Sequence, residues 1–185
     1  AWHADNAKFF EMAKRLDALD LGDPDQLAVK LEQFHGDHYR LELHVLELVT
    51  AGNAFDGGDD AHACRFGKWL DTFKSTNPEL QRLIQEAGGP HEALHQAVAK
   101  LKKLLHEGKK AEALQLYKQN VETNAVRNMA LIEQMREQVK AGSDFLARCE
   151  KQAVDVCRAS QMKANELLDA IIKANSAVAA ASVTD

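Results

Sequence analysis

The sequence predicts an all-α protein, an antiparallel four-helix bundle with long helical extensions at both ends. Two observations carry this prediction. Apolar residues recur at alternating steps of three and four along most of the 185 residues, which is the period of one helix face. Gly (10 residues), Pro (3) and aromatic residues (6%) are scarce, whereas a strand-and-turn architecture needs many of them.

The composition of the chain argues against several classes of protein. Hydrophobic residues make up 45% and charged residues 28%, which is typical of a folded, soluble chain. The net charge of -5 argues against nucleic acid as a partner, because such binding needs a basic surface. No run of eighteen apolar residues occurs, so we expect no membrane span inside the chain. Three Cys are too few for a disulfide scaffold.

The first half of the chain predicts two helices. Residues 2–20 carry one apolar stripe, and Pro24 interrupts the pattern. Residues 25–51 form the second predicted helix, which ends at Gly52. His38 is the only polar residue on the stripe of that second helix, whose members are Leu27, Leu31, Phe34, His38, Leu41, Val45 and Leu48.

The middle of the chain predicts a loop and shorter helices. Residues 52–63 read as a loop and residues 64–73 as a short helix. Pro78 begins another helix that runs to about Glu86. The triplet at 88–90, Gly-Gly-Pro, is expected to interrupt it, and helix resumes over residues 91–107.

The last part predicts one long helix from about residue 110 to 180, with Gly142-Ser143 as the plausible break and a stutter at residues 149–157. These elements predict three regions: an N-terminal stalk helix (1–24), a four-helix bundle (25–140) and a C-terminal helical extension (141–185). Because the chain starts and stops in helical pattern, it resembles a fragment lying between two membrane spans.

Histidine and cysteine positions predict a metal site. His91 and His95 are four residues apart, which puts both imidazoles on one helix face. His38 replaces a core hydrophobe, and burying an imidazole without a partner is costly. Cys64 begins a short helix, where the first-turn amides are expected to lower its pKa. Three His and one Cys form a ligand set suited to tetrahedral zinc.

Several motifs resemble the chemoreceptor zinc-binding domain family. They are Asp37-His38, the segment Ala51 to Gly57, Asp60, the run Cys64-Arg65-Phe66-Gly67-Lys68-Trp69-Leu70, and Pro90-His91-Glu92-Ala93-Leu94-His95. The resemblance covers about residues 25–140, and the Cys-x-Phe-Gly-Lys-Trp element is its most specific part. It implies Zn²⁺ bound by His38, Cys64, His91 and His95. Leu41 stands where family members usually carry Trp, which leaves His35 as an alternative ligand; His62 is a second one.

The resemblance implies a non-enzymatic sensory domain of a bacterial chemotaxis receptor, with zinc or an oxidant as the stimulus. Metal binding or Cys64 oxidation would then alter helix packing. The Gly-x-x-Phe-x-Gly pattern upstream of Cys64 is similar to extracytoplasmic forms. We therefore expect a periplasmic location, with membrane spans flanking the chain and a homodimer formed through the helices; a cytoplasmic location is the alternative.

Other functions remain open from the residues alone. A di-iron, hemerythrin-like bundle also uses helical His pairs, but it needs His-x-x-x-Glu, and Leu48 follows His44 at that spacing. A zinc hydrolase keeps an open coordination position, which four protein ligands would close. A helical ligand-binding sensor without metal is the third alternative. Cys149 and Cys157 are interpreted as small core residues, with a dimer disulfide as the other possibility.

Overall fold

The computed structural model describes residues 2–182, which contain helices and no strand, and the predicted all-α helical bundle is confirmed. Two compact units are present. One comprises residues 20–142 and the other residues 1–19 with 143–185. Among the described residues, no helix is both long and apolar enough to cross a membrane.

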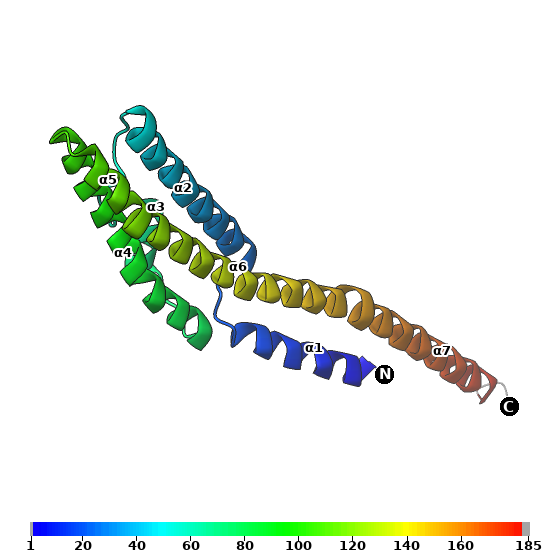
Figure 1. Ribbon diagram of the computed structural model, residues 1–185. Coiled ribbons are helices and arrows are strands. Elements are labelled where there is room, and N and C mark those ends of the chain that lie inside the picture. Colours follow the sequence, from blue (N-terminus) through cyan, green and yellow to red (C-terminus); the bar gives the residue numbers. More distant parts are fainter. Residues whose placement is uncertain (1, 183–185) are drawn as a thin grey trace. The chain divides into compact units, whose positions relative to one another are not determined.

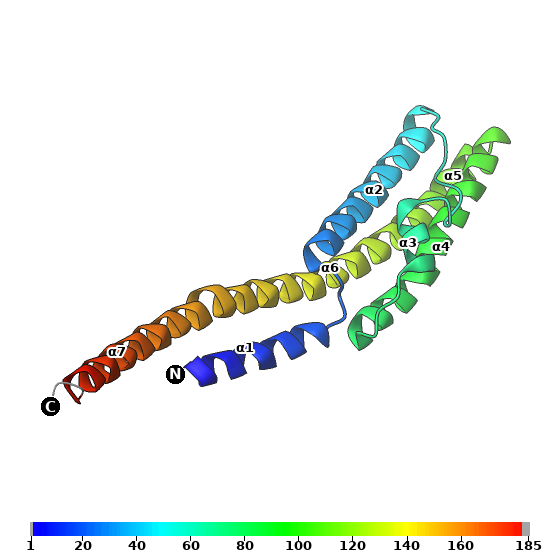
Figure 2. The same cartoon turned by 180° about the vertical axis from the view of Figure 1, so that it is seen from behind.

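The unit of residues 20–142 is built on three long helices and two short ones. α2 (Pro24–Ala51) and α4 (Pro78–His106) run in the same direction, and α6 (Glu122–Lys151) runs against both (Figure 1). The short helix α3 (Arg65–Thr72) follows the long loop that descends from the end of α2, as the reverse view in Figure 2 also shows. α5 (Lys110–Leu116) leads into α6. One part of the core joins α2, α4, α5 and the start of the last helical segment through Val45, Val49, Leu94, Val98, Leu101, Ala113, Val121 and Ala125.

Local signals explain where α2 begins and ends. The carboxylate of Asp23 accepts a hydrogen bond from the amide of Gln26 at 3.0 Å, and Pro24 occupies the first turn. Gly52 ends the helix with a left-handed φ of 79°. The helix therefore spans almost the range that the sequence predicts, and it places His38 on its buried face.

The predicted interruption at residues 88–90 is wrong, because α4 continues through Pro90 without a break. Proline lacks the N–H that would bond the carbonyl of Glu86, and its ring normally clashes with the side chain of the preceding residue. Here that residue is Gly89, which has no side chain to clash. Continuity of α4 keeps His91 and His95 on one rigid helix face.

Helical structure also continues from Lys110 to Ser182, so Gly142-Ser143 does not break it. Two wider, π-helical turns interrupt the α-helical geometry, at Tyr117–Val121 (η1) and Gln152–Cys157 (η2). η2 coincides with the stutter predicted from the apolar pattern. A π-helical turn holds one extra residue, which is what a stutter requires.

The second unit consists of α1 (Trp2–Asp17), the end of α6, η2 and α7 (Arg158–Ser182). The carbonyl of Asp5 accepts a hydrogen bond from Gln152 Nε2 at 3.2 Å and one from the Cys157 thiol at 3.4 Å. Ser160 also donates to the Asp5 carboxylate. These contacts join α1 to the π-helical turn, where Cys157 is buried as a small packing residue.

Candidate metal centre

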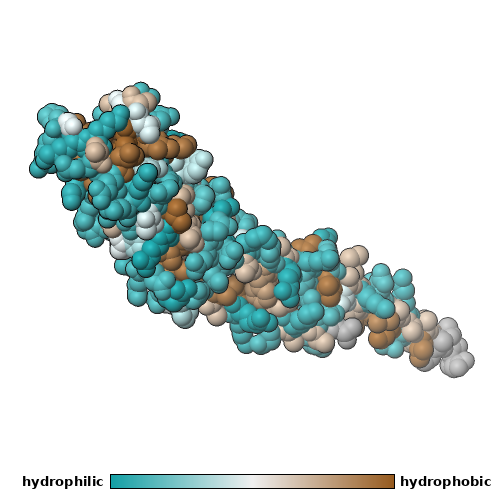
Figure 3. Space-filling view, in the orientation of Figure 1, coloured by the Kyte–Doolittle hydropathy of each residue, from teal (hydrophilic) through white to brown (hydrophobic). Residues whose placement is uncertain are grey.

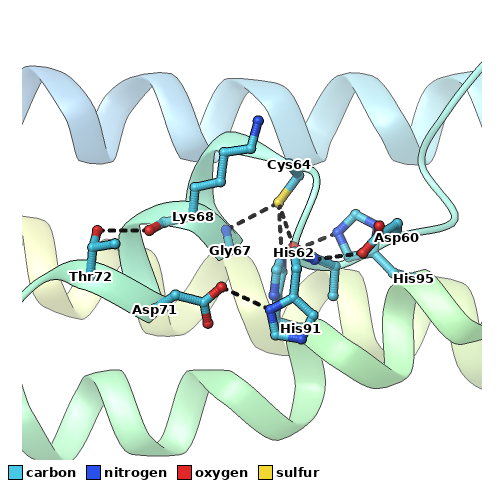
Figure 4. Close-up of polar contacts among 10 residues, drawn as sticks. Asp60, His62, Cys64, Gly67, Lys68, Asp71, Thr72, His91 and His95 are labelled. Carbon is cyan, nitrogen blue, oxygen red and sulfur yellow. Dashed lines mark hydrogen bonds and ion pairs between the residues drawn. The ribbon is translucent and has the colours of Figure 1, made fainter.

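Four side chains from three elements converge in the unit of residues 20–142. The ligand atoms of His38 on α2, Cys64 at the start of α3, and His91 and His95 on α4 all lie within 4.8 Å of one another. The three imidazoles are almost fully buried, with 2–3% of their surface exposed. Figure 4 shows Cys64 directed toward His91 and His95 from the segment that precedes α3.

The spacing of these donors fits one small cation. Cys64 Sγ lies 3.1 Å from His91 Nε2, and His91 Nε2 lies 3.1 Å from His95 Nε2. Ligands at ordinary zinc distances in a tetrahedron are about 3.3 Å apart for two nitrogens and about 3.5 Å apart for sulfur and nitrogen. These two separations require shifts of only a few tenths of an ångström to reach that geometry.

Backbone carbonyls orient two of the imidazoles. His38 Nδ1 lies 2.7 Å from the carbonyl oxygen of Phe34, and His95 Nδ1 lies 2.9 Å from that of Gly58. A carbonyl can only accept, so each Nδ1 carries the proton and each Nε2 presents a lone pair to the cluster. This is the tautomer that a metal-binding histidine requires.

His38 Nε2 is the atom that most directly indicates a metal-binding role. It is buried and has no hydrogen-bond partner among the residues that the structure describes. A buried acceptor without a partner is rare, because its desolvation costs free energy that nothing offsets. A metal ion bound by the same four side chains would satisfy this lone pair, and the donor set of three His and one Cys suits zinc.

Burial lowers the basicity of the histidines in the absence of a metal. It lowers the pKa of His38 to about 4 and, together with the neighbouring His95 and His38, that of His91 to about 3. The pKa of His95 is lowered as well, again mainly by burial. The imidazoles are therefore neutral and available as ligands over the whole physiological pH range.

The prediction that the helix start lowers the pKa of the Cys64 thiol is wrong. Burial raises the pKa of this thiol, and the amides of Gly67 and Phe66, which favour the thiolate, only partly offset that effect. The Gly67 amide donates to Cys64 Sγ at 3.2 Å, and the thiol contacts the carbonyl of Ala61 at 3.3 Å. The helix start thus supplies a cap geometry, but a bound cation is needed to deprotonate the sulfur.

The short helix α3 fits against the site because of two residue types. Gly67 lies so close to the preceding loop that a Cβ there would sit 1.8 Å from the carbonyl oxygen of Ala61 and 3.1 Å from His91 Cε1. Phe66 is buried against the imidazoles, with ring centroids 5.1 Å from His91 and 5.6 Å from His38. Trp69 stacks on Phe66 at 5.8 Å. The Cys-x-Phe-Gly-Lys-Trp run is therefore a wall of the site.

The other histidines lie outside the cluster. His35 is half-buried, whereas His3, His44 and His106 are exposed. His62 is exposed and bonds the carboxylate of Asp71 at 2.9 Å, which raises its pKa (Figure 4). Within residues 2–182, the group able to hold a metal ion contains neither His35 nor His62.

Sequence reasoning missed the role of Arg65. Its guanidinium donates to both carboxylate oxygens of Asp37, through Nε at 2.8 Å and Nη2 at 2.7 Å. Asp37 precedes His38 in the sequence, but His38 bonds the backbone carbonyl of Phe34. Nothing in the spacing of residues 37 and 65 indicates this pairing, which depends on how α3 packs against α2.

A pocket of about 290 Å³ opens beside the cluster. It lies between α2 and the loop of residues 55–64, and its walls include His38, Cys64 and His95. Small molecules from solvent can therefore reach the ligand atoms through this pocket. This opening distinguishes the centre from one sealed inside a core.

Together these features define an all-α bundle with a cluster of four side chains, three of them buried, that could hold a metal ion. Residues 38–102 match the family model of the chemoreceptor zinc-binding domain. The recognition made from the sequence motifs is thereby confirmed, and zinc is the metal of the family. No curated protein and no solved structure matches the chain significantly.

The family match also bears on class and location. The family is one of sensory and signalling domains and is not an enzyme family. Its members are cytoplasmic, so the predicted periplasmic location is wrong. The prediction rested on helical pattern at both chain ends and on the Gly-x-x-Phe-x-Gly pattern. Neither depends on the compartment, because helices pack in the same way on either side of a membrane.

Proposed function

We propose that the chain is a signal-input domain of a bacterial chemoreceptor, in which His38, Cys64, His91 and His95 bind one zinc ion. The observation that carries the proposal is the convergence of the four donors around the unpartnered Nε2 of His38. In this proposal residues 25–140 form the zinc-binding bundle, and residues 1–24 and 141–185 form the helical extensions that connect it to the rest of a receptor.

The signal in this proposal is a change in how α3 packs against α2 and α4. Cys64 caps the start of α3, whereas the three histidines belong to the long helices. Bound zinc would hold α3 in place through the sulfur, and loss of that bond would release it. Oxidation of the Cys64 thiolate to the sulfenic acid removes a strong ligand, and the pocket beside Cys64 gives an oxidant access.

The decisive experiment is the metal content of the purified chain, measured by elemental mass spectrometry. We expect about one zinc per chain in the wild type and strongly reduced zinc in Cys64→Ala and His38→Ala. His35→Ala tests the alternative first ligand, and His106→Ala, an exposed histidine on α4, is the matched control; both should retain zinc. Two irons per chain would favour the hemerythrin-like alternative, and no metal would leave a helical sensor for another ligand.

The proposal includes a homodimer formed through the second unit. α7 exposes large apolar side chains along its length, among them Leu167 (61% exposed) and Ile171 (56%), and Figure 3 shows apolar surface in brown toward the C-terminal end of the chain. These two residues continue the heptad stripe of the long helix, which is the pattern of a coiled-coil seam. Sedimentation equilibrium should give a dimer for the wild type and a monomer for the Leu167→Lys, Ile171→Lys double variant.

A further inference from the structure

We propose that Lys102 is a positioning residue for the metal centre, although it contacts none of the four candidate ligands. It acts through the loop of residues 55–58, whose backbone orients His95. This inference rests on the proposed zinc-binding function, and it assigns control of metal release to a residue outside the donor set.

Lys102 holds the loop in two ways. Its Nζ donates a hydrogen bond to the carbonyl of Gly57 at 2.6 Å, and the same ammonium lies 4.3 Å from the centroid of the Phe55 ring. A cation over an aromatic face is attracted to its electron density. Lys102 therefore holds both the side chain and the backbone of the loop onto α4.

The next residue of the loop orients a candidate ligand. The carbonyl of Gly58 lies 2.9 Å from His95 Nδ1 and selects the tautomer that leaves Nε2 free for metal. Lys102 and His95 are seven residues apart on α4, so both lie on the same side of one helix. Contacts thus lead from Lys102 on α4 to the loop, and from the loop back to the imidazole of His95 on the same helix.

At Gly58 the loop lies close against the side chain of Leu41 on α2. Gly58 has a φ of 80°, and a Cβ on it would lie 2.5 Å from Leu41 Cδ1. Phe55 and Gly58 also line the pocket between α2 and the loop, which leads to His38, Cys64 and His95. Release of the loop from Lys102 would widen this pocket and remove the acceptor that orients His95. Both changes favour loss of a bound metal.

The test compares zinc release from the wild type, Lys102→Met and Lys102→Arg, loaded with one zinc and mixed with a chromophoric chelator. Lys102→Met keeps the aliphatic stem but loses the charge and the donors. We expect its release rate to rise about 10-fold, the lower end of the effect of changing residues that orient metal ligands. Lys102→Arg keeps a cation over Phe55 and donors for Gly57, so its rate should be close to that of the wild type. Lys100→Met, an exposed lysine on the same helix, is the matched control.

A second readout separates positioning from general stabilisation. The thermal unfolding temperature of the zinc-free protein should be nearly the same for the wild type and Lys102→Met, whereas the zinc-loaded proteins should differ. Equal release rates, or an equal loss of stability with and without zinc, would overturn the inference. Failure of the wild type itself to bind zinc would refute the proposed function, which distinguishes the two outcomes.

Discussion

Arg65 and Asp37 form a bidentate ion pair that joins the residue after Cys64 to the residue before His38, with N–O distances of 2.8 and 2.7 Å. The two candidate ligands thus lie on elements that are held together independently of any metal. Because a guanidinium and a carboxylate pair through two parallel hydrogen bonds, the contact also fixes the direction in which α3 approaches α2.

The first prediction concerns this pair. Asp37→Asn and Arg65→Gln should each lower the thermal unfolding temperature of the zinc-free protein, and the double variant should lose no more than either single variant. The deficit should shrink as salt is added, because both side chains are partly exposed to solvent. Additive losses in this double-mutant cycle would show that the two residues act separately.

The second prediction concerns the contact of α3 with the loop before it. Gly67→Ala should prevent normal packing of α3 and abolish stoichiometric zinc binding, because its Cβ would overlap the carbonyl of Ala61. Gly88→Ala is the matched control, since nothing lies within 4 Å of a Cβ at that position of α4. Alanine there should stabilise the protein by about 0.5–1 kcal/mol. Zinc content and denaturant unfolding of both variants check the prediction.

The third prediction is a loss of stability of the zinc-free protein in mild acid. The unfolded chain takes up a proton on each histidine near pH 6.5, whereas folded His38 and His91 stay neutral down to a pKa of about 4 and about 3. The unfolded state therefore binds more protons, and stability falls as the pH drops from about 6.5 to about 4. For His38 the full effect is roughly 3 kcal/mol.

A variant isolates the contribution of His38 to this pH dependence. His38→Leu restores an apolar residue on the buried stripe of α2 and should flatten the slope of unfolding free energy between pH 6.5 and 4. Thermal or urea unfolding of metal-stripped protein across this range gives the slope directly. An unchanged slope in His38→Leu would mean that His38 is protonated in the folded state, contrary to its burial.

The fourth prediction concerns Asn128, which lies on the buried face of α6. Its side chain is fully buried, and both polar atoms lack a hydrogen-bond partner among the described residues. Asn128→Leu, which keeps the same branched arrangement of heavy atoms, should raise the unfolding free energy by about 1–2 kcal/mol. Asn124→Leu, one turn earlier, is the control, because Asn124 already bonds the carbonyl of Asn120 at 2.7 Å and should gain nothing comparable.

Sequence patterns were sufficient to predict the helices and to select the four side chains that the structure brings together. His38 could be selected because it is the one polar residue on an apolar stripe. The apolar face of a helix packs against the core, so a histidine on that face is expected to be buried. His91 and His95 stood out because a spacing of four places two side chains on one face. Both signals depend only on the spacing of residues within one helix, and this spacing can be read directly from the sequence.

Two of the features that the sequence did not predict depend on distant segments. The bond from Lys102 to Gly57 and the pair of Arg65 with Asp37 join residues that are 45 and 28 positions apart. The continuity of α4 through Pro90 was mispredicted because the helix-breaking effect of proline was counted without the relief that Gly89 provides. The direction of the Cys64 pKa shift was mispredicted because the amides at the helix start, which lower the pKa, were considered without burial, which raises it.

The π-helical turn η2 has a consequence for the face that α7 presents. From Cys149 to Cys157 is eight residues, and in a regular α-helix that spacing would leave the second side chain about 80° away from the first. The wider turn absorbs this excess, and both cysteines are buried. Conversion of η2 to regular α-helix would rotate every later side chain of α7 about the helix axis by about 100°. A change of one residue in this single turn would therefore replace the exposed face of α7 by another. The helix would stay unbroken throughout.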